Sequence, residues 1–407
     1  MNDISSSAVK YMMLQNEMRY FKLNRILLLI LGLWPYQDSK SARLRITLIF
    51  SILMSSILFQ LRVFMTDDVT SNLIIKVLSA TLCHIITGIQ YISFWINMKT
   101  VRWSIEYLRH ICNNLKDENE IAIIEIYSRN MRRYTLGLTL FGVCCMLVLI
   151  VGSILGQNND IFLFTNGSRP YRVWMIIDYF VDRKKNLCMI LLHTNVTICI
   201  GLTIILATGT MLLGHLQYVC GMFSIASYRI SQAINIDQKA QNDINLKNEI
   251  MIYKEIICAV DIHRKAMEYS TFLINNFEGT FFFLIILGVT SLSFNLYRIF
   301  QITSIEYDVK ELLLHLTYLN IILLYMFLSN YIGQQVTDHY NYIFLTAYSV
   351  QWYVTPLTIQ KLLVLLLQRG NKNFALIIGR LFAASLECFA TLSSASMSYF
   401  TVMYSVQ

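Results

Sequence analysis

The polar side chains of this chain are scattered through long apolar stretches, and few are spaced for chemistry. The seven histidines are dispersed, and none forms the His-x-x-x-His pair of a helical metal site. The sequence also contains no Cys-x-x-Cys pair, phosphate-binding glycine loop or nucleophile elbow. It therefore predicts no enzyme, no cofactor and no metal site.

The polar residues within apolar stretches leave two interpretations open. His193 and Asn195 stand two positions apart, so they face different directions on a helix. Such side chains usually face a bundle interior or a water-filled cavity. They either form hydrogen bonds between helices or contact a bound ligand. Glu278 and Glu387 are the deepest acidic residues, and pairing with a cation at the inner side explains them better than cation binding does.

Small and hydroxyl side chains concentrate in the last apolar stretch, which permits close helix contact or a wet pore lining. They are Ala383, Ala384, Ser385, Ala390, Thr391, Ser393, Ser394, Ala395, Ser396 and Ser398. Nearby, Val402, Ser405 and Val406 share one helical face by their three- and four-residue spacing. A ring of such valines would gate a pore by dewetting, but ordinary packing explains the pattern equally well.

The elements that must position these residues are membrane-spanning helices. The chain is 56% hydrophobic and 14% charged, with only three prolines in 407 residues, whereas soluble proteins average about 25% charged residues. Because a spanning helix needs about 20 apolar residues, this composition excludes a large soluble helical protein. Seven stretches qualify: 45–64, 73–98, 135–156, 186–214, 271–297, 311–331 and 374–404. The fold class is therefore an all-α membrane protein with seven transmembrane helices.

The distribution of basic residues predicts the orientation, because cytoplasmic loops carry an excess of lysine and arginine. Twenty-four of the 33 basic residues lie on the side that includes the N-terminus. The N-terminus is then cytoplasmic and the C-terminus extracellular, opposite to a G-protein-coupled receptor. The asymmetry also explains the net charge of +8, so no nucleic-acid partner is expected. The Asn166-Gly167-Ser168 sequon falls in a predicted external loop, where Asn166 is a candidate glycosylation site.

Two inner segments do not cross the membrane. In 215–269, Ile250, Tyr253, Ile257 and Val260 recur at helical spacing, so the fourth and fifth spans should project beyond the membrane as helices. In 342–368, an apolar run after Pro356 is too short to span and too apolar for water. We expect this run to pack on the projecting helices and on neighbouring subunits, as a cytoplasmic anchor.

The predicted organisation has four parts. Residues 1–44 form a cytoplasmic amphipathic segment, in which 11–25 is expected to be a helix that lies on the membrane surface or dips into the bundle. Residues 45–331 hold spans one to six with the ligand pocket. Residues 332–372 form the anchor, and 373–407 the last span. The nine cysteines lie mostly within spans and are interpreted as packing residues.

Specific motifs resemble the insect odorant receptor family over essentially the whole chain, and some stretches of sequence are similar to receptors of ants and other Hymenoptera. The matches are Asn24-Arg25, Gly32-Leu33-Trp34-Pro35, Gly333-Gln334-Gln335, His339, Ala347-Tyr348, Trp352-Tyr353, Lys361 to Arg369, Ser385-Leu386-Glu387 and Ser398-Tyr399-Phe400-Thr401-Val402. Asn373 departs from the family, in which proline is common after the basic cluster.

The resemblance implies a subunit of an odorant-gated, non-selective cation channel in the plasma membrane of olfactory neuron dendrites. Such receptors form heterotetramers with the odorant coreceptor, and their seventh helix lines the pore, here at Val402, Ser405 and Val406. The alternative is a gustatory-type receptor that acts as a homotetramer. A transporter would predict inverted repeats, which are not evident.

The resemblance also places the ligand between spans two and six, in the outer half of the bundle. The residues of that region are Ser79, Cys83, Leu147, Val151, Ile154, Met189, Leu192, His193, Val196, Phe283, Leu287, Tyr318 and Ile322. This mainly aliphatic lining predicts a small apolar odorant or pheromone, and the Hymenopteran likeness suggests a hydrocarbon. We expect few hydrogen bonds between the ligand and this lining. Membrane lipid is the other partner expected for the chain.

Overall fold

The computed structural model describes residues 21–37, 39–66, 70–162, 187–239, 246–306 and 308–405, which are almost entirely helical. The elements are α2 (Lys22–Ile30), α3 (Lys40–Leu61), α4 (Val63–Thr66), α5 (Ser71–Ile96), α6 (Met98–Asn114), α7 (Glu118–Phe162), α8 (Leu187–Lys239), α9 (Leu246–Gln301), α10 (Val309–Ser349), α11 (Leu357–Gly370), β1 (Ile377–Ile378), β2 (Phe382–Ala383) and α12 (Leu386–Ser405). A π-helical turn (Ile302–Glu306) follows α9, and a 3₁₀ turn (Trp352–Val354) follows α10.

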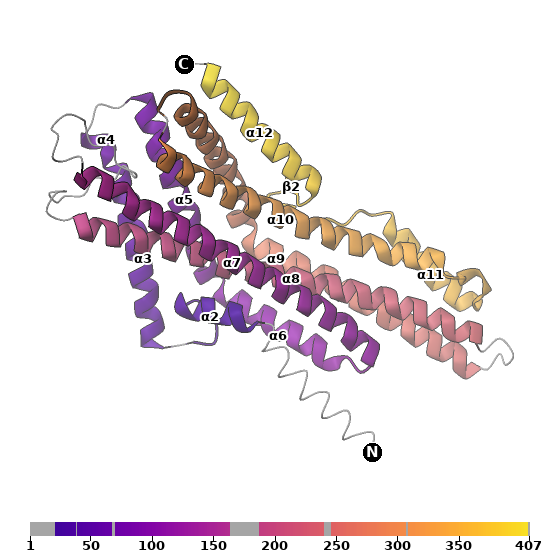
Figure 1. The fold of residues 1–407 in the computed structure, drawn as a ribbon. Coiled ribbons are helices and arrows are strands. Elements are labelled where there is room, and N and C mark those ends of the chain that lie inside the picture. The colour runs from indigo at the N-terminus through magenta and orange to yellow at the C-terminus, as the bar shows by residue number, and fades with distance from the viewer. Residues whose placement is uncertain are drawn as a thin grey trace.

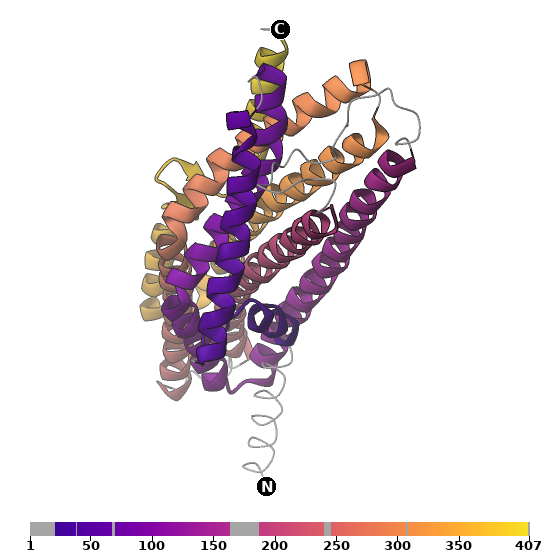
Figure 2. The same ribbon diagram turned by 90° about the vertical axis from the view of Figure 1, so that its left-hand side faces the viewer.

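The long helices form one elongated bundle, in which α8 and α9 extend well past α3 and α5 toward α11 (Figure 1). We call the end with α6, α11 and the far ends of α8 and α9 the inner half, and the opposite end the outer half, following the predicted orientation. Seen from the side, the helices converge at the inner half, and α7 slants away from α3 and α5 toward the outer end (Figure 2).

Six of the described helices are long and apolar enough to cross a membrane, namely α3, α5, α7, α8, α9 and α10. They contain the first six predicted spans, which confirms those predictions. Polar caps begin two of them: the Ser39 hydroxyl accepts from Ala42 N at 3.2 Å, and the Thr70 hydroxyl accepts from Leu73 N at 3.3 Å. The continuous helices α8 and α9 also confirm that spans four and five project beyond the apolar region.

The seventh predicted span, 374–404, is wrong in its first third. A small hairpin replaces the helix there, with Ile377 paired to Ala383 and Ile378 to Phe382. Gly379 and Arg380 both have positive φ, at 59° and 58°, as the two central residues of a type I′ turn require. The helix α12 begins only at Leu386, and its 20 residues still measure about 30 Å in length. By composition α12 is not among the six apolar helices, since serines and threonines lower its hydropathy.

The N-terminal segment dips into the bundle where the structure describes it. Leu28, Leu31 and Leu33 are completely buried, and the Asn24 amide donates to the Thr210 hydroxyl of α8 at 2.9 Å. Gly32, at a φ of 74°, ends α2 in a Schellman motif, because its N–H bonds to Leu29 O and the N–H of Leu33 bonds to Leu28 O. The predicted amphipathic stretch, 11–25, lies mostly outside the described residues, so its placement on the membrane surface or in the bundle stays a prediction.

The anchor run after Pro356 forms α11, as predicted. Its Ile359, Leu363 and Leu366 are buried against α9 and α10, and Leu357 and Leu365 are exposed. On α9, the predicted stripe of Ile250, Tyr253, Ile257 and Val260 is helical but exposed, and the opposite side carries the buried Ile252, Ile256 and Ala259. The inner half therefore has a closed core and an apolar exterior.

Candidate functional site

An apolar cavity of about 70 Å³ lies in the outer half, between α5, α7, α8 and α10. Each of these helices is apolar on the face it turns to the others, and the lack of a side chain at Gly201 leaves space in the wall. Its lining consists of Cys83, His84, Ile86 and Thr87 from α5, Leu149 from α7, Thr197, Ile198, Gly201, Leu202 and Ile205 from α8, and Tyr318, Ile321 and Ile322 from α10. We call it the outer cavity.

The polar groups of the outer cavity differ in whether they already have partners. The Thr87 hydroxyl donates to His84 O at 2.8 Å, and the Thr197 hydroxyl donates to His193 O at 2.9 Å. The Tyr318 hydroxyl, in contrast, is buried without a hydrogen-bond partner in the described part of the chain. An unpaired buried hydroxyl is costly, at about 1–3 kcal/mol. A guest with a hydrogen-bonding group would remove that cost.

Three of the predicted ligand-binding residues, Cys83, Tyr318 and Ile322, line the outer cavity together. Ser79 lies one helical turn from Cys83 and is completely buried, with its hydroxyl bonded to Lys76 O at 2.8 Å. It supports the wall but does not reach the space.

His193 connects helices. Its Nε2 lies 3.0 Å from the Ser55 hydroxyl of α3, and its ring contacts Phe59 edge-on. Of the two interpretations left open for this residue, the hydrogen bond between helices describes its contacts. Val196 and Leu287 are half-buried and do not line the outer cavity.

The remaining predicted positions lie away from the cavity. The exposed ones on the outside of the bundle are Leu147, Val151, Met189, Leu192 and Phe283. Ile154 belongs to α7, but its side chain lies outside what the structure describes, and Asn166 and Val406 fall outside the described residues.

The cavity residues that the sequence analysis did not identify include a regular stripe on α8. Thr197, Gly201 and Ile205 recur every four residues and so share one face. Thr197 and Gly201 are small, and small residues one turn apart on a spanning helix indicate a face turned to other helices. This spacing is the feature of the sequence that could have identified the cavity-lining face of α8. Apolarity alone does not distinguish a face turned to the bundle from one that faces lipid.

A second, larger cavity of about 120 Å³ lies deeper in the bundle. We call it the inner cavity. Its walls come from α7, α8, α9, α10 and the hairpin before α12, and include Leu138, Gly142, Leu206, Gly209, Phe281, Leu324, Tyr325, Ser329 and Leu376. Leu202, Ile205 and Ile321 line both cavities. The two spaces are therefore neighbours separated by aliphatic side chains.

The helix α9 contacts both the wall of the outer cavity and α12. The Ser291 hydroxyl is hydrogen-bonded to the Cys83 thiol at 3.7 Å. Two residues later, the Ser293 hydroxyl lies 3.0 Å from Ser396 O of α12 and 2.9 Å from Val289 O of its own helix, so its one proton is shared between the two carbonyls. Farther out, the Phe300 ring packs edge-on against Tyr404 of α12, with centroids 4.8 Å apart. The cavity wall and α12 are thus connected through side-chain contacts of a single helix, α9.

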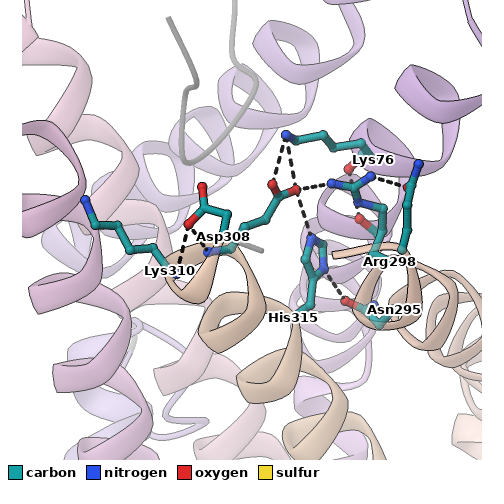
Figure 3. Close-up of polar contacts among 9 residues, drawn as sticks. Lys76, Asn295, Arg298, Asp308, Lys310 and His315 are labelled. Carbon is teal, nitrogen blue, oxygen red and sulfur yellow. Dashed lines mark hydrogen bonds and ion pairs between the residues drawn. The ribbon is translucent and has the colours of Figure 1, made fainter. Parts of the chain in front are cut away.

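A buried ion cluster fixes α5, α9 and α10 to one another at the outer end (Figure 3). The Glu311 carboxylate pairs with the Arg298 guanidinium and, at 3.1 Å, with the Lys76 ammonium. His315 lies 3.7 Å from the same carboxylate and is hydrogen-bonded at 2.9 Å to Asn295. Arg298 is only 1% exposed. Because a buried charge is tolerated only when paired, this cluster sets the relative positions of the three helices.

The exposed face of α12 carries hydroxyl groups. Thr391, Ser394, Ser398, Val402 and Ser405 are exposed and follow one another at three- and four-residue steps. On its other side, α12 packs against α9 and α10, and its Leu392 and Ser396 are buried there. Two of the three predicted pore residues, Val402 and Ser405, therefore lie on a face that no other described part of the chain covers.

Comparison with known proteins agrees with this architecture. A family model described as 7tm Odorant receptor matches residues 70–397. The insect olfactory receptor OR5 from Machilis hrabei has the same fold, both in complex with eugenol and in a second structure. Each gives a TM-score of 0.77 at 14% identity, covering 98% of this chain and 100% of the other. No curated protein matches the sequence. The chain belongs to the 7tm odorant receptor family, a family of multi-pass receptors and not of enzymes.

Proposed function

We propose that this chain is the ligand-binding subunit of an odorant-gated, non-selective cation channel that works with the odorant coreceptor. It would act in the plasma membrane of olfactory neuron dendrites. The observation that carries the proposal is the outer cavity, an apolar space between four helices with the unpaired Tyr318 hydroxyl in its wall. Apolar pockets with a few placed polar groups are the usual form of small-molecule sites.

The lining supports a small, mainly apolar ligand. Seven of the thirteen wall residues are aliphatic, contributed by all four helices, so burial of apolar surface would supply the affinity. The Tyr318 hydroxyl would add one hydrogen bond. One of the similar structures is a complex with the small odorant eugenol, and we propose that this chain also takes a small, mainly apolar ligand that bears a hydrogen-bonding group, at Cys83, Tyr318 and Ile322.

The outward faces of the subunit support assembly around a pore. The hydroxyl face of α12 would line a wet passage, with Val402 narrowing it and Ser405 beside it. At the inner half, Ile250, Tyr253 and Leu365 are exposed although they are apolar. Exposed apolar patches mark interaction sites, and we assign these to contacts with the other subunits of a heterotetramer, in an anchor formed by 332–372 and the ends of α8 and α9.

Gating would follow from a population shift. A ligand that fits the outer cavity better in one arrangement of α5 and α10 favours that arrangement in proportion to its difference in affinity. The Cys83–Ser291 and Ser293–Ser396 hydrogen bonds would pass the shift through α9 to α12.

Whole-cell current in cells that express the chain with and without the coreceptor tests the proposal. The stimuli are alkanes, alcohols and esters, and surface expression is verified by antibody labelling. We expect an evoked cation current only when both subunits are present. Current from this chain alone would favour the gustatory-type homotetramer. Silence of correctly expressed pairs across the whole panel would contradict an odorant channel with this class of ligand.

A further inference from the structure

The outer and inner cavities share three wall residues, Leu202, Ile205 and Ile321. We infer that the ligand is an elongated molecule with an oxygen-bearing end at Tyr318 and an alkyl chain that passes Ile205 and Ile321 into the inner cavity. This inference rests on the proposed function, because it takes the outer cavity as the odorant site.

The partition between the cavities is made of movable groups. Its members are aliphatic side chains, which change rotamer readily compared with backbone. Among the described residues, side chains alone separate the two cavities: Leu202 and Ile205 lie on α8, and Ile321 faces them from α10. An alkyl chain can therefore displace the partition without unfolding a helix.

The length of the joined space suits a chain rather than a compact ring. Along α10 the lining residues run from Tyr318 to Ile332, which is about 21 Å of helix at the usual rise of 1.5 Å per residue. The deeper part is the larger of the two, at about 120 Å³ against about 70 Å³. A ligand confined to the outer cavity would leave the larger part of the joined apolar space unfilled.

The polar groups of the two cavities differ in whether they are free to bind the oxygen of a ligand. In the outer cavity the Tyr318 hydroxyl is unpaired. In the inner cavity the Thr210 hydroxyl accepts from Asn24 at 2.9 Å, and the Ser329 hydroxyl donates to Met326 O at 3.0 Å. The Gln90 amide forms no hydrogen bond among the described residues, so the Tyr325 hydroxyl in the inner cavity is a second donor open to a ligand. Of the two tyrosines only Tyr318 lines the outer cavity, and an alcohol, aldehyde or ester that places its oxygen there has its alkyl end directed inward.

Two glycines of α8 give a matched pair of variants. A Cβ at Gly201, in the outer cavity, would lie 3.5 Å from Thr87, and a Cβ at Gly209, in the inner cavity, would lie 3.5 Å from Tyr325. Both are ordinary contacts, so Gly201→Ala and Gly209→Ala add one methyl group to one cavity each without a clash. Gly137→Ala is the control for the gain in helix propensity, since its Cβ would meet nothing within 4 Å.

The experiment measures half-maximal concentrations for a homologous series of linear alcohols and acetates on channels formed with the coreceptor. We expect Gly209→Ala to raise the value about tenfold for long members and to leave short members unchanged, because one extra methylene in a filled pocket changes discrimination by roughly that factor. Gly201→Ala should raise the value for all lengths. Ser329→Leu, which fills the inner cavity from α10, should repeat the effect of Gly209→Ala.

Other outcomes would contradict this inference, and they distinguish its failure from a failure of the proposed function. If Gly201→Ala is effective but Gly209→Ala and Ser329→Leu change no chain length, the outer cavity is the site and the inner cavity does not hold the ligand. If the inner-cavity variants shift short and long members equally, they act on gating and the inference is wrong. If Gly201→Ala is also without effect on a responding channel, the outer cavity itself is not the odorant site.

Discussion

The inner and outer halves of this bundle differ in how completely they are packed. In the inner half, Ile252, Val336, Tyr340 and Leu363 belong to one continuous cluster and are completely buried. In the outer half, the described side chains form smaller separate clusters around Leu149 and around Leu292, with the outer cavity beside them. Close-packed interiors resist gradual deformation. The comparison indicates a fixed inner half and an outer half with room for a ligand.

Ion pairs nevertheless connect the helices of the outer half, where side chains form only small separate clusters. The ion cluster of Lys76, Arg298 and Glu311 connects three helices. Such a cluster sets position without filling space, which leaves the neighbouring cavity open. The two halves are therefore stabilised by different interactions, and variants can separate them.

The largest effect is expected from Glu311→Gln, which removes the only carboxylate that the described residues place in the cluster. Arg298 and Lys76 would be left without it, and breaking a buried pair costs about 3–5 kcal/mol. Thermal unfolding of purified protein in detergent should show a large loss of stability. Glu125→Gln removes an exposed pair with Arg129 and should cost at most about 1 kcal/mol. Equal effects of the two variants would show that the cluster does not hold the outer half.

The inner half is tested by Leu363→Ala on α11. Leu363 is completely buried, and truncating such a leucine costs about 2–5 kcal/mol because a cavity remains. Leu365→Ala, on the same helix but 61% exposed, is the matched control and should hardly change the unfolding temperature of the isolated subunit. A fixed inner half would be contradicted if Leu363→Ala were equally mild.

The junction between the halves is tested by Gly333→Ala. A Cβ there would lie 2.4 Å from Ala384 Cβ and 2.6 Å from its carbonyl oxygen, so the backbone before α12 must shift. Overpacking of this kind costs about 1–3 kcal/mol. We expect lower stability together with a changed basal current, because the start of α12 moves. Gly279→Ala, whose Cβ meets nothing within 4 Å, should change neither quantity.

The smallest effect is expected from Tyr318→Phe in the outer cavity. The variant loses the free hydroxyl but keeps the ring, so responses to alcohols and esters should weaken by about 1 kcal/mol, roughly fivefold in half-maximal concentration. Responses to alkanes should persist. Tyr325→Phe serves as the control in the inner cavity. Equal loss of alkane and alcohol responses would mean that the hydroxyl does not contact the ligand.

Much of the fold could be predicted from the sequence, because the bilayer imposes long apolar helices and loop charges differ between the two sides. The first six spans and the helical anchor run after Pro356 follow from length and composition alone. The hairpin at Gly379 and Arg380 could not be predicted in this way. The segment is as apolar as a spanning helix, and only the left-handed backbone at both residues interrupts it.

The site was predictable only in part, for a physical reason. Apolar side chains face both lipid and the bundle interior, so hydropathy does not tell Leu192, which is exposed, from Leu202, which is buried in the cavity wall. Cys83, Tyr318 and Ile322 could be placed by regional resemblance. Gly201 and Thr197 needed the small-residue spacing along α8, and the pairing of Arg298 with Glu311 needed the three-dimensional arrangement.

The most direct test of a ligand-binding outer half is an experimental structure of the channel with and without an odorant that evokes current. We expect density for the odorant in the outer cavity, with an oxygen atom near the Tyr318 hydroxyl. We also expect displacement of α9 and α12 relative to α10, with the contacts of Leu363 and Tyr340 unchanged. Odorant density that does not enter the outer cavity, or an inner half that moves as much as the outer half, would contradict this expectation.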